Sequence, residues 1–310
     1  MTGLATRPTS RLRAPLLGAL AALLCGACGG GDSATQPPAL RDRIVFYRSD
    51  DGPAQVYAID PDGSHELRVT TSQANDAFPM LSPDGRRIAF GSDRGGAYDI
   101  WIMNADGSNP TQLTHLGSAT VIATHPAWSP DGSKIAFRVA EGDVANLYVM
   151  NADGSGIAPL TSGTMIYGAP AWSPDGRKIV VSRASTPTDP PEIFVMNADG
   201  TAPVQLTSSG INEDPSWSPD GSKIAFNCRD PDREVCVMNA DGSGIVQLTH
   251  NDAVADVYPW WSLDGAKIVF SSSRDGDYEV YVMDANGANQ TRLTHAPGID
   301  FRPKWGRVRS

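Results

Sequence analysis

The chain contains five histidines, the side chains that most often bind a metal ion or move a proton at neutral pH. Three of them follow a Leu-Thr pair that recurs along the sequence. Equivalent positions of regular repeats lie apart in space, so these histidines cannot converge on one metal ion. These three are His115, His250 and His295. His65 has no evident partner, and His125 differs from the others because it directly precedes a proline. We therefore predict no metal site and no cofactor.

Motifs of the common hydrolases and nucleotide-binding enzymes are absent from the sequence. It has no Gly-x-Ser-x-Gly elbow, no Gly-rich phosphate loop and no His-Glu-x-x-His pair. The side chains that could do acid–base chemistry together are His125, Glu213, Asp214 and Arg302, and no motif orders them. Catalysis is therefore the less favoured interpretation, with a hydrolase or lyase acting on carbohydrate or peptide as the alternative.

Aspartates recur in Asn-Ala-Asp-Gly strings, for example between Asn151 and Gly154. Calcium requires about six to eight oxygen ligands, whereas each string offers two side chains before the next apolar run. Asp and Gly are also the residues that tight turns favour. We interpret the strings as turns, and a calcium ion shared between loops is left open.

Cys228 and Cys236 form a local pair. Both are cysteine in one repeat only, and the position of Cys236 is aromatic in the others. The loop between them is centred on Asp232, so a symmetric hairpin would place the two opposite each other. In an exported protein this pattern favours a structural disulfide over two buried thiols.

Three short motifs recur with a spacing of about 45 residues, the length of one propeller blade. The first is Ser-Pro-Asp-Gly, the second Asn-Ala-Asp-Gly and the third Leu-Thr. The copies of the first begin at Ser82, Ser129, Ser173 and Ser218, and at Ser262 with Leu in place of Pro. Each repeat reads as four short strands separated by turns, and the second and third strands are apolar at nearly every position. A sheet covered on both faces by its neighbours is typical of a propeller blade.

The two ends of the chain carry complementary parts of one repeat. The segment around Trp305 is a first strand, and the segments beginning near Arg43, Gln55 and Leu67 are the second, third and fourth strands. We predict an all-β, closed six-bladed β-propeller over residues 41–310, with four antiparallel strands per blade. Closure would hide the sheet edges at the chain ends. An open six-unit solenoid would leave this complementarity unexplained.

The residue before the proline of each first strand is expected to lie at one mouth of the central channel, held extended by that proline. Equivalent positions would be alike if only the scaffold selected them, yet here they carry six different chemistries. We interpret them as a ligand-binding set, with unselected drift as the alternative. The set is Phe78, His125, Ala169, Asp214, Tyr258 and Arg302. By contrast, tryptophan recurs three residues after most of these positions and is predicted to form core between blades. These residues are Trp128, Trp172, Trp217, Trp261 and Trp305.

The Pro-x-Trp-Ser-Pro-Asp-Gly and Met-Asn-Ala-Asp-Gly strings, with Ser-Asp-Arg-Gly-Gly from Ser92, resemble the TolB-type propeller repeat family across residues 41–310. The resemblance is specific for fold and carries little information about activity. The family's periplasmic member has an additional N-terminal α/β domain, whereas only a short segment precedes the first repeat here. Its docking role at the cell envelope is therefore not carried over directly.

The N-terminal segment is predicted to direct export. Three arginines precede a short apolar run, and Gly26-Ala27 lies directly before Cys28, which resembles a lipoprotein cleavage box with Cys28 as the lipidated residue. Cys25 departs from that box, and an ordinary secretory signal is the alternative. Residues 29–40 are predicted to be a flexible tether, and Gly29 favours sorting to the outer membrane if the organism has two membranes.

The composition narrows the function classes. The chain is 40% hydrophobic with 31 Gly and 24 Pro, which argues against a helix bundle. Its net charge is −10, and removing residues 1–28 with their three arginines gives −13, so nucleic acid is not an expected partner. We expect a monomeric, non-catalytic scaffold lipoprotein at the periplasmic face of the outer membrane that binds a protein or peptide of the cell envelope.

Overall fold

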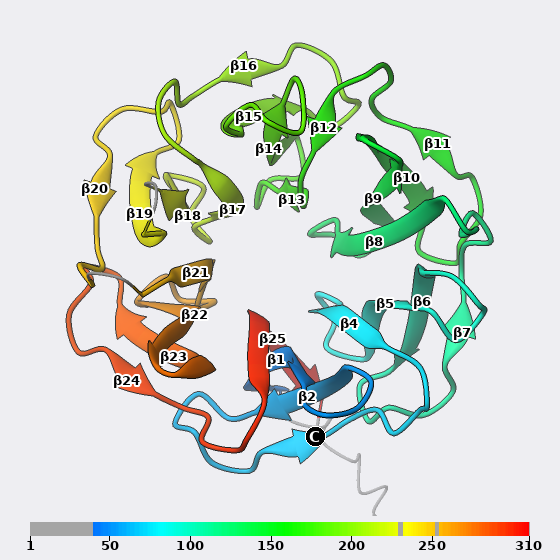
Figure 1. The fold of residues 1–310 in the computed structure, drawn as a ribbon, viewed down its shortest axis with the longest axis horizontal. Helices are drawn as coiled ribbons and strands as arrows, with labels where there is room; N and C mark the ends of the chain where they lie inside the picture. The colour runs from blue at the N-terminus through cyan, green and yellow to red at the C-terminus, as the bar shows by residue number, and fades with distance from the viewer. Residues whose placement is uncertain (1–39, 229–231, 252–253, 310) are drawn as a thin grey trace, which may run out of the picture. The chain divides into compact units, whose positions relative to one another are not determined.

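Short runs of β-branched and aromatic residues, separated by Gly- and Asp-rich turns, form strands along the whole described chain. The computed structural model describes residues 40–228, 232–251 and 254–309, and within these residues it contains strands and turns but no helix. Accordingly, no helix in the described part of the chain could cross a membrane. Figure 1 shows the sheets arranged around a central axis.

Four of the sheets have four antiparallel strands each, as the repeats predict. The first contains β25 (Ile299–Arg309), β1 (Leu40–Ser49), β2 (Gln55–Ile59) and β3 (Leu67–Arg68). The second contains β4 (Asp76–Leu81), β5 (Arg87–Ser92), β6 (Asp99–Asn104) and β7 (Thr111–Gln112). The third contains β17 (Glu213–Trp217), β18 (Lys223–Cys228), β19 (Glu234–Asn239) and β20 (Val246–Gln247). The fourth contains β21 (Asp256–Trp261), β22 (Lys267–Asp275), β23 (Asp277–Asp284) and β24 (Thr291–Arg292).

The fifth sheet has nine strands and joins two repeats, which departs from the expectation of four antiparallel strands per blade. One repeat supplies β8 (Val121–Trp128), β9 (Lys134–Glu141), β10 (Val144–Asn151) and β11 (Ala158–Pro159). The next supplies β12 (Ile166–Tyr167), β13 (Ala171–Trp172), β14 (Lys178–Ala184), β15 (Glu192–Asn197) and β16 (Val204–Gln205). The long β9–β10 hairpin lets Ala145 pair with Ile166 in parallel, so hydrogen bonds continue from one repeat into the next. The number of blades therefore stays a prediction.

The first strand of the second of these repeats is broken into β12 and β13 at Gly168-Ala169-Pro170. A Cβ on Gly168 would lie 2.2 Å from the Ser182 hydroxyl oxygen, so the backbone approaches β14 more closely there than other residues allow. Pro170 has no N–H to donate to the ladder. Together these residues interrupt the strand.

The C-terminal strand pairs with the N-terminal strand, as the complementary repeat parts predict. β25 runs antiparallel to β1 from Leu40↔Arg309 to Ser49↔Ile299, with Ile44 opposite Trp305. β1 begins at Leu40, the last residue of the predicted tether. The sheet that contains both ends of the described chain is thereby stabilised by hydrogen bonds between residues about 260 positions apart in the sequence.

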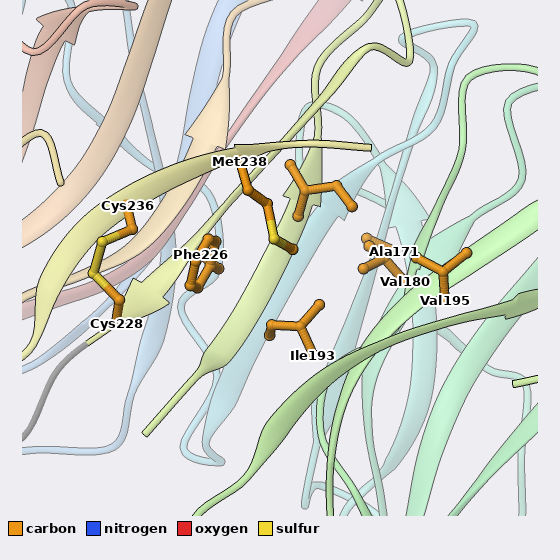
Figure 2. Close-up of a cluster of buried hydrophobic side chains, with 9 residues drawn as sticks. Ala171, Val180, Ile193, Val195, Phe226, Cys228, Cys236 and Met238 are labelled. Atoms are coloured by element: carbon orange, nitrogen blue, oxygen red, sulfur yellow. A yellow bond between two sulfur atoms is a disulfide. The ribbon is translucent and has the colours of Figure 1, made fainter. Parts of the chain in front are cut away.

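The core consists of apolar clusters between adjacent sheets. In one cluster Val180 and Ile193 of β14 and β15 pack with Phe226 and Met238 of β18 and β19 (Figure 2). A phenylalanine recurs on the second strand of most repeats, and Phe46, Phe90, Phe137, Phe226 and Phe270 are all fully buried. Burying one such side chain stabilises the fold by about 1.5–3 kcal/mol. The second and third strands are therefore apolar because both of their faces pack against neighbouring sheets.

The repeated aspartates serve the turns. In the Ser129 turn the hydroxyl donates to Asp131 at 2.6 Å and accepts from the Lys134 backbone N–H at 2.9 Å. Hydrogen bonds from serine lower the pKa of Asp131 to about 2. In an Asn-Ala-Asp-Gly turn, Asp153 accepts from both the backbone and the hydroxyl of Ser155. These contacts are those of Asx turns.

Cys228 and Cys236 form a disulfide, with their Cα atoms 5.8 Å apart. Figure 2 shows this bond beside Phe226. The expected facing register is wrong: Cys236 lies opposite Phe226, and Cys228 lies opposite Glu234. The disulfide therefore links diagonal neighbours on two adjacent strands, within the ordinary range of Cα separations.

The recurrent tryptophans divide into two groups. Trp128, Trp261 and Trp305 are buried, as predicted for core between sheets, whereas Trp172 and Trp217 are half-buried. All five also line a cavity of about 300 Å³ formed with the prolines of the Ser-Pro-Asp-Gly turns. Their role is thus both packing and the lining of this cavity.

Candidate functional site

The residues that precede the first-strand prolines have a backbone conformation that the sequence did not predict. Five of the six have positive φ, so the expectation that proline holds them extended is wrong. The values are 57° at Phe78, 55° at His125, 50° at Asp214, 60° at Tyr258 and 55° at Arg302. Only Ala169, in the gap between β12 and β13, is not among them.

The physical reason is a β-bulge at each of these five prolines. For example, the pairing of β4 with β5 skips between Ala77 and Met80, and that of β8 with β9 skips between Thr124 and Ala127. A bulge inserts an extra residue, bends the strand and redirects a side chain. A non-glycine residue at positive φ also costs of order 1–3 kcal/mol, and such conformations cluster at ligand sites.

These side chains surround one end of the central axis. A cavity of about 470 Å³ is lined by His125, Ala169, Asp214, Tyr258 and Arg302 of the set. Phe78 lines a narrow neck of about 20 Å³, which shares His125, Ala169 and Arg302 with the larger cavity. The structure therefore brings all six predicted residues together; we call the larger cavity and the neck the mouth cavity.

Arg302 joins the predicted residues across the mouth cavity. Its Nη1 lies 2.7 Å from Oδ1 of Asp214, and the two side chains are only 16% and 14% exposed. The guanidinium carbon lies 4.1 Å from the ring centre of Tyr258 and 5.6 Å from that of Phe78. Burial alone would lower the pKa of Arg302, but Asp214 and the two tyrosines beside it, Tyr258 and Tyr47, raise it above its ordinary value.

Asn227 of β18 binds the second carboxylate oxygen of Asp214. Its amide Nδ2 donates to Oδ2 of Asp214 at 3.1 Å, and its Oδ1 accepts from the backbone N–H of Tyr258 at 2.8 Å. Glu213 is paired instead with Arg233 at 3.1 Å. Burial, followed by the charge of Asp214, raises the pKa of Glu213. Both acids among the candidates for acid–base chemistry, Glu213 and Asp214, are thus already paired with arginines.

The ring of His125 packs against that of Phe78 at a tilt of 31°, with ring centres 4.0 Å apart, and its Nδ1 lies 2.9 Å from the hydroxyl oxygen of Thr124. Burial, together with the charges of Arg302, Arg138 and Lys304, lowers the pKa of His125 well below its usual range. The imidazole is therefore neutral at pH 7, and it contributes a polar but uncharged surface to the mouth cavity.

Further aromatic side chains pack against Phe78 and Tyr258 of the mouth cavity. Phe301 contacts Tyr258 and Tyr278, with ring centres 5.8 and 4.7 Å away, and Tyr47 contacts both Phe78 and Phe301. Arg138, Glu213 and Arg233 line the larger cavity together with Tyr258. The mouth cavity therefore combines charged lining residues with aromatic rings.

Sequence reasoning missed Tyr47, Arg138, Tyr278 and Lys304. The signal that selected the pre-proline residues would also have found these residues, because each occupies a repeat position whose chemistry varies. Tyr47 and Arg138 follow the second-strand phenylalanine, and Lys304 lies two residues after Arg302. Only the fold shows that Arg138 lines the larger cavity and Lys304 the neck, and that Tyr47 and Tyr278 pack against Phe78 and Phe301.

The remaining histidines do not join the site. His65 bonds to Asp60 at 2.8 Å on the surface, so it does have a partner there. The three histidines after Leu-Thr are not among the residues that line the mouth cavity. Within the residues that the structure describes, no group of three or more His, Cys, Asp or Glu side chains is placed to hold a metal ion. Cys28 lies outside the described residues.

The described fold and the repeated strings agree with one family. The model of the TolB beta propeller domain matches residues 36–124, 111–182 and 162–256. The chain belongs to this family. Among solved structures, the TolB propeller found here is similar to TolB from Acinetobacter baumannii, at 20% identity and a TM-score of 0.75, over 85% of this chain and 66% of that one. It is also similar to a putative TolB from Agrobacterium tumefaciens, at 22% identity and a TM-score of 0.67, over 87% and 99%.

The curated relatives match over shorter stretches. The Tol-Pal system protein TolB of Desulfosudis oleivorans is 32% identical over 81 residues, which is 26% of this chain and 18% of the relative. The chain therefore aligns with about a fifth of that protein's length. The propeller fold is shared, and the activities and partners of such relatives are not transferred by this match.

Proposed function

We propose that this TolB-type propeller is a non-catalytic binding protein that presents its mouth cavity to a protein or peptide of the cell envelope. The observation that carries the proposal is the convergence of six equivalent repeat positions, each with a different side chain, around one cavity. A symmetric scaffold has no need for this variety, whereas a binding site does.

The surroundings of the mouth cavity favour binding over catalysis. Asp214 is tied to Arg302 and Asn227, and Glu213 to Arg233, so each acid already has a partner. A general acid or base must instead be free to reach the proton it transfers. Aromatic rings beside charged side chains are suited to a peptide, since aromatic and arginine side chains dominate protein-binding sites.

We further propose the six-bladed arrangement, with the nine-stranded sheet counted as two blades and β25 closing the ring. Export is part of the same proposal: residues 1–28 as a lipoprotein signal, Cys28 as the lipidated residue and residues 29–40 as a tether. The protein would then act as a monomer at the periplasmic face of the outer membrane. Its family supports an envelope location.

Capture of envelope proteins by the wild-type chain and by a mouth variant tests the proposal. Asp214→Ala with Tyr258→Ala removes one charged and one aromatic contact, and should abolish capture of the partner. The control, Asp284→Ala with Val246→Ala, removes a carboxylate and an exposed apolar side chain from other surfaces and should capture normally. Tyr258→Ala alone repeats the test if the double variant unfolds.

Unchanged capture by both folded mouth variants would remove the site from the proposal. Turnover of a glycan or peptide that is lost in the same variants would instead favour the alternative hydrolase or lyase. The control separates a specific effect from a general loss of solubility, because it changes the surface without changing the mouth cavity.

A further inference from the structure

The charges around the mouth cavity are not balanced. Three cations, Arg138, Arg302 and Lys304, lie close enough to His125 for their charges to act on it. The larger cavity is also lined by Arg233 and by three carboxylates, of which Asp214 pairs with Arg302 and Glu213 with Arg233, and Asp189 is the third. Over the larger cavity and the neck together, four cations therefore stand against three carboxylates, in a chain whose sequence has a net charge of −10.

Arg138 of β9 lines the mouth cavity without a carboxylate partner among the residues that the structure describes. Its Nε donates to the backbone carbonyl of Tyr167 at 2.8 Å, which fixes the guanidinium in place. Burial, followed by the charge of Arg302, lowers the pKa of Arg138. Because no other repeat has a charged residue at this position, the repeat scaffold does not require an arginine here.

Lys304 of β25 lines the neck, together with His125, Ala169 and Arg302. Its ammonium lies 3.7 Å from the ring centre of Trp260, and it has no ion-pair partner within the described part of the chain. Burial and the charge of Arg302 lower the pKa of Lys304 to about 7. A desolvated cation without a counter-ion destabilises the fold, so its presence calls for a reason.

We propose that the mouth cavity binds a carboxylate of the partner protein, from an acidic side chain or a chain terminus, between Arg138 and Lys304. This inference rests on the proposed function, because it names the group that the partner supplies. A guanidinium matches a carboxylate with two parallel hydrogen bonds, and an ammonium adds a point charge. The larger cavity of about 470 Å³, which Arg138 lines, admits a side chain or a short extended segment, and Lys304 lines the neck, which shares His125, Ala169 and Arg302 with that cavity.

Binding of a carboxylate would also be coupled to a proton. Lys304 faces Arg302 on its own strand, Asp214 of β17, His125 of β8 and Trp260 of β21. A bound negative charge favours the protonated form of Lys304. At pH 8, where the free amine is largely unprotonated, binding should therefore take up protons from the buffer.

Calorimetric titration of the chain without residues 1–28 with three short peptides tests the inference. The probe is Ac-Gly-Ala-Glu-Ala-Gly-amide, with the Gln peptide as its neutral match and the Gln peptide with a free C-terminal carboxylate as a second anion. We expect one or both carboxylate peptides to bind about tenfold or more tightly than the neutral peptide. Measurement at pH 8 in two buffers of different ionisation enthalpy gives the proton uptake.

Two variants assign the effect to residues. Arg138→Gln should remove most of the difference between charged and neutral peptides, and Lys304→Met should remove the proton uptake. The matched controls are Arg183→Gln, which changes an arginine stacked 3.7 Å over Phe194, and Lys223→Met on the surface. Neither control residue lines the mouth cavity, so both should behave as wild type.

The inference is overturned if charged and neutral peptides bind alike, or if the two cavity variants bind the charged peptide as wild type does. It is also overturned if inorganic phosphate, and no carboxylate peptide, binds with this dependence on Arg138 and Lys304. Failure of the proposed function looks different: envelope capture would then survive Tyr258→Ala. Capture that depends on Tyr258 but not on Arg138 or Lys304 would support the proposed binding function and refute the binding of a carboxylate.

Discussion

The ion pair between Arg302 and Asp214 gives a quantitative prediction, because it links the C-terminal strand to a repeat 88 residues earlier. Arg302→Gln removes the cation, Asp214→Asn removes the carboxylate, and the double variant removes both. Asparagine tolerates the positive φ of 50° at position 214, so this substitution adds little backbone strain.

The magnitude follows from the geometry. Two charges about 4 Å apart attract each other by about 4 kcal/mol at an effective dielectric constant of about 20. Both side chains are partly exposed, at 16% and 14%, which reduces that figure. We therefore expect each single variant to lose about 2–3 kcal/mol of unfolding free energy, because it leaves the other charge partly buried and without its partner.

Denaturant unfolding of the wild type, the two single variants and the double variant measures the coupling energy between Arg302 and Asp214. The double variant should lose clearly less than the sum of the single losses, with a coupling of about 1.5–2 kcal/mol. Losses that add to within about 0.5 kcal/mol would show that the pair does not hold the mouth together. Equal m-values, the slopes of unfolding free energy against denaturant concentration, show that the variants expose the same surface on unfolding.

Three further predictions concern other parts of the fold. Removing the disulfide with Cys228→Ala and Cys236→Ala should cost about 2.5 kcal/mol, and an unfolding curve that is insensitive to reductant would contradict this. Lys304→Met should stabilise the protein at pH 7, with a gain that shrinks toward pH 10. Between about pH 7 and about 10.4 the wild-type folded state binds fewer protons than the unfolded state, so the stability of the wild type rises with pH in this range. A stability gain of Lys304→Met that does not change with pH would refute the lowered pKa of Lys304. Gly200→Ala should lower the free energy of unfolding by more than about 2 kcal/mol, because its Cβ would lie 2.0 Å from the Leu160 carbonyl oxygen. Gly96→Ala has open space around the added Cβ and should lower it by about 1–2 kcal/mol. Equal melting temperatures of the two variants would refute this.

The repeated strings were enough to predict the fold class and the pairing of the chain ends. The Ser-Pro-Asp-Gly and Asn-Ala-Asp-Gly turns fix where strands end, and the apolar second and third strands fix which faces are buried. The pairing of Ile44 with Trp305 follows from the missing strands of one repeat. The turns and the buried faces depend on local chemistry, and the pairing of the chain ends follows from the strands that each end of the sequence lacks.

The conformation at the site could not be predicted in the same way. The residue before a proline is biased toward extended backbone, yet Phe78 and its equivalents are at positive φ because bulges interrupt the pairing. A bulge depends on the register of two strands, which no short motif encodes. The diagonal position of the disulfide has the same origin, since Cys236 pairs with Phe226.

Variation among repeat positions also marks Arg138 and Lys304, but their contribution to the site could be recognised only once the fold was known. Each is an ordinary charged residue in an apolar strand, and only the arrangement of the sheets brings them beside His125. Variation among equivalent repeat positions is a usable signal, but it identifies a site only after the positions that face the axis are known.

Site-specific photo-crosslinking tests the central claim most directly. A photoreactive phenylalanine analogue is placed at Tyr258 in the mouth cavity, at Trp172 in the tryptophan-lined cavity or at Val204 on an exposed strand. The account predicts a discrete crosslinked partner from Tyr258 alone, lost when Arg302 is replaced by Gln. Crosslinks from Trp172 or Val204 with none from Tyr258 would contradict it.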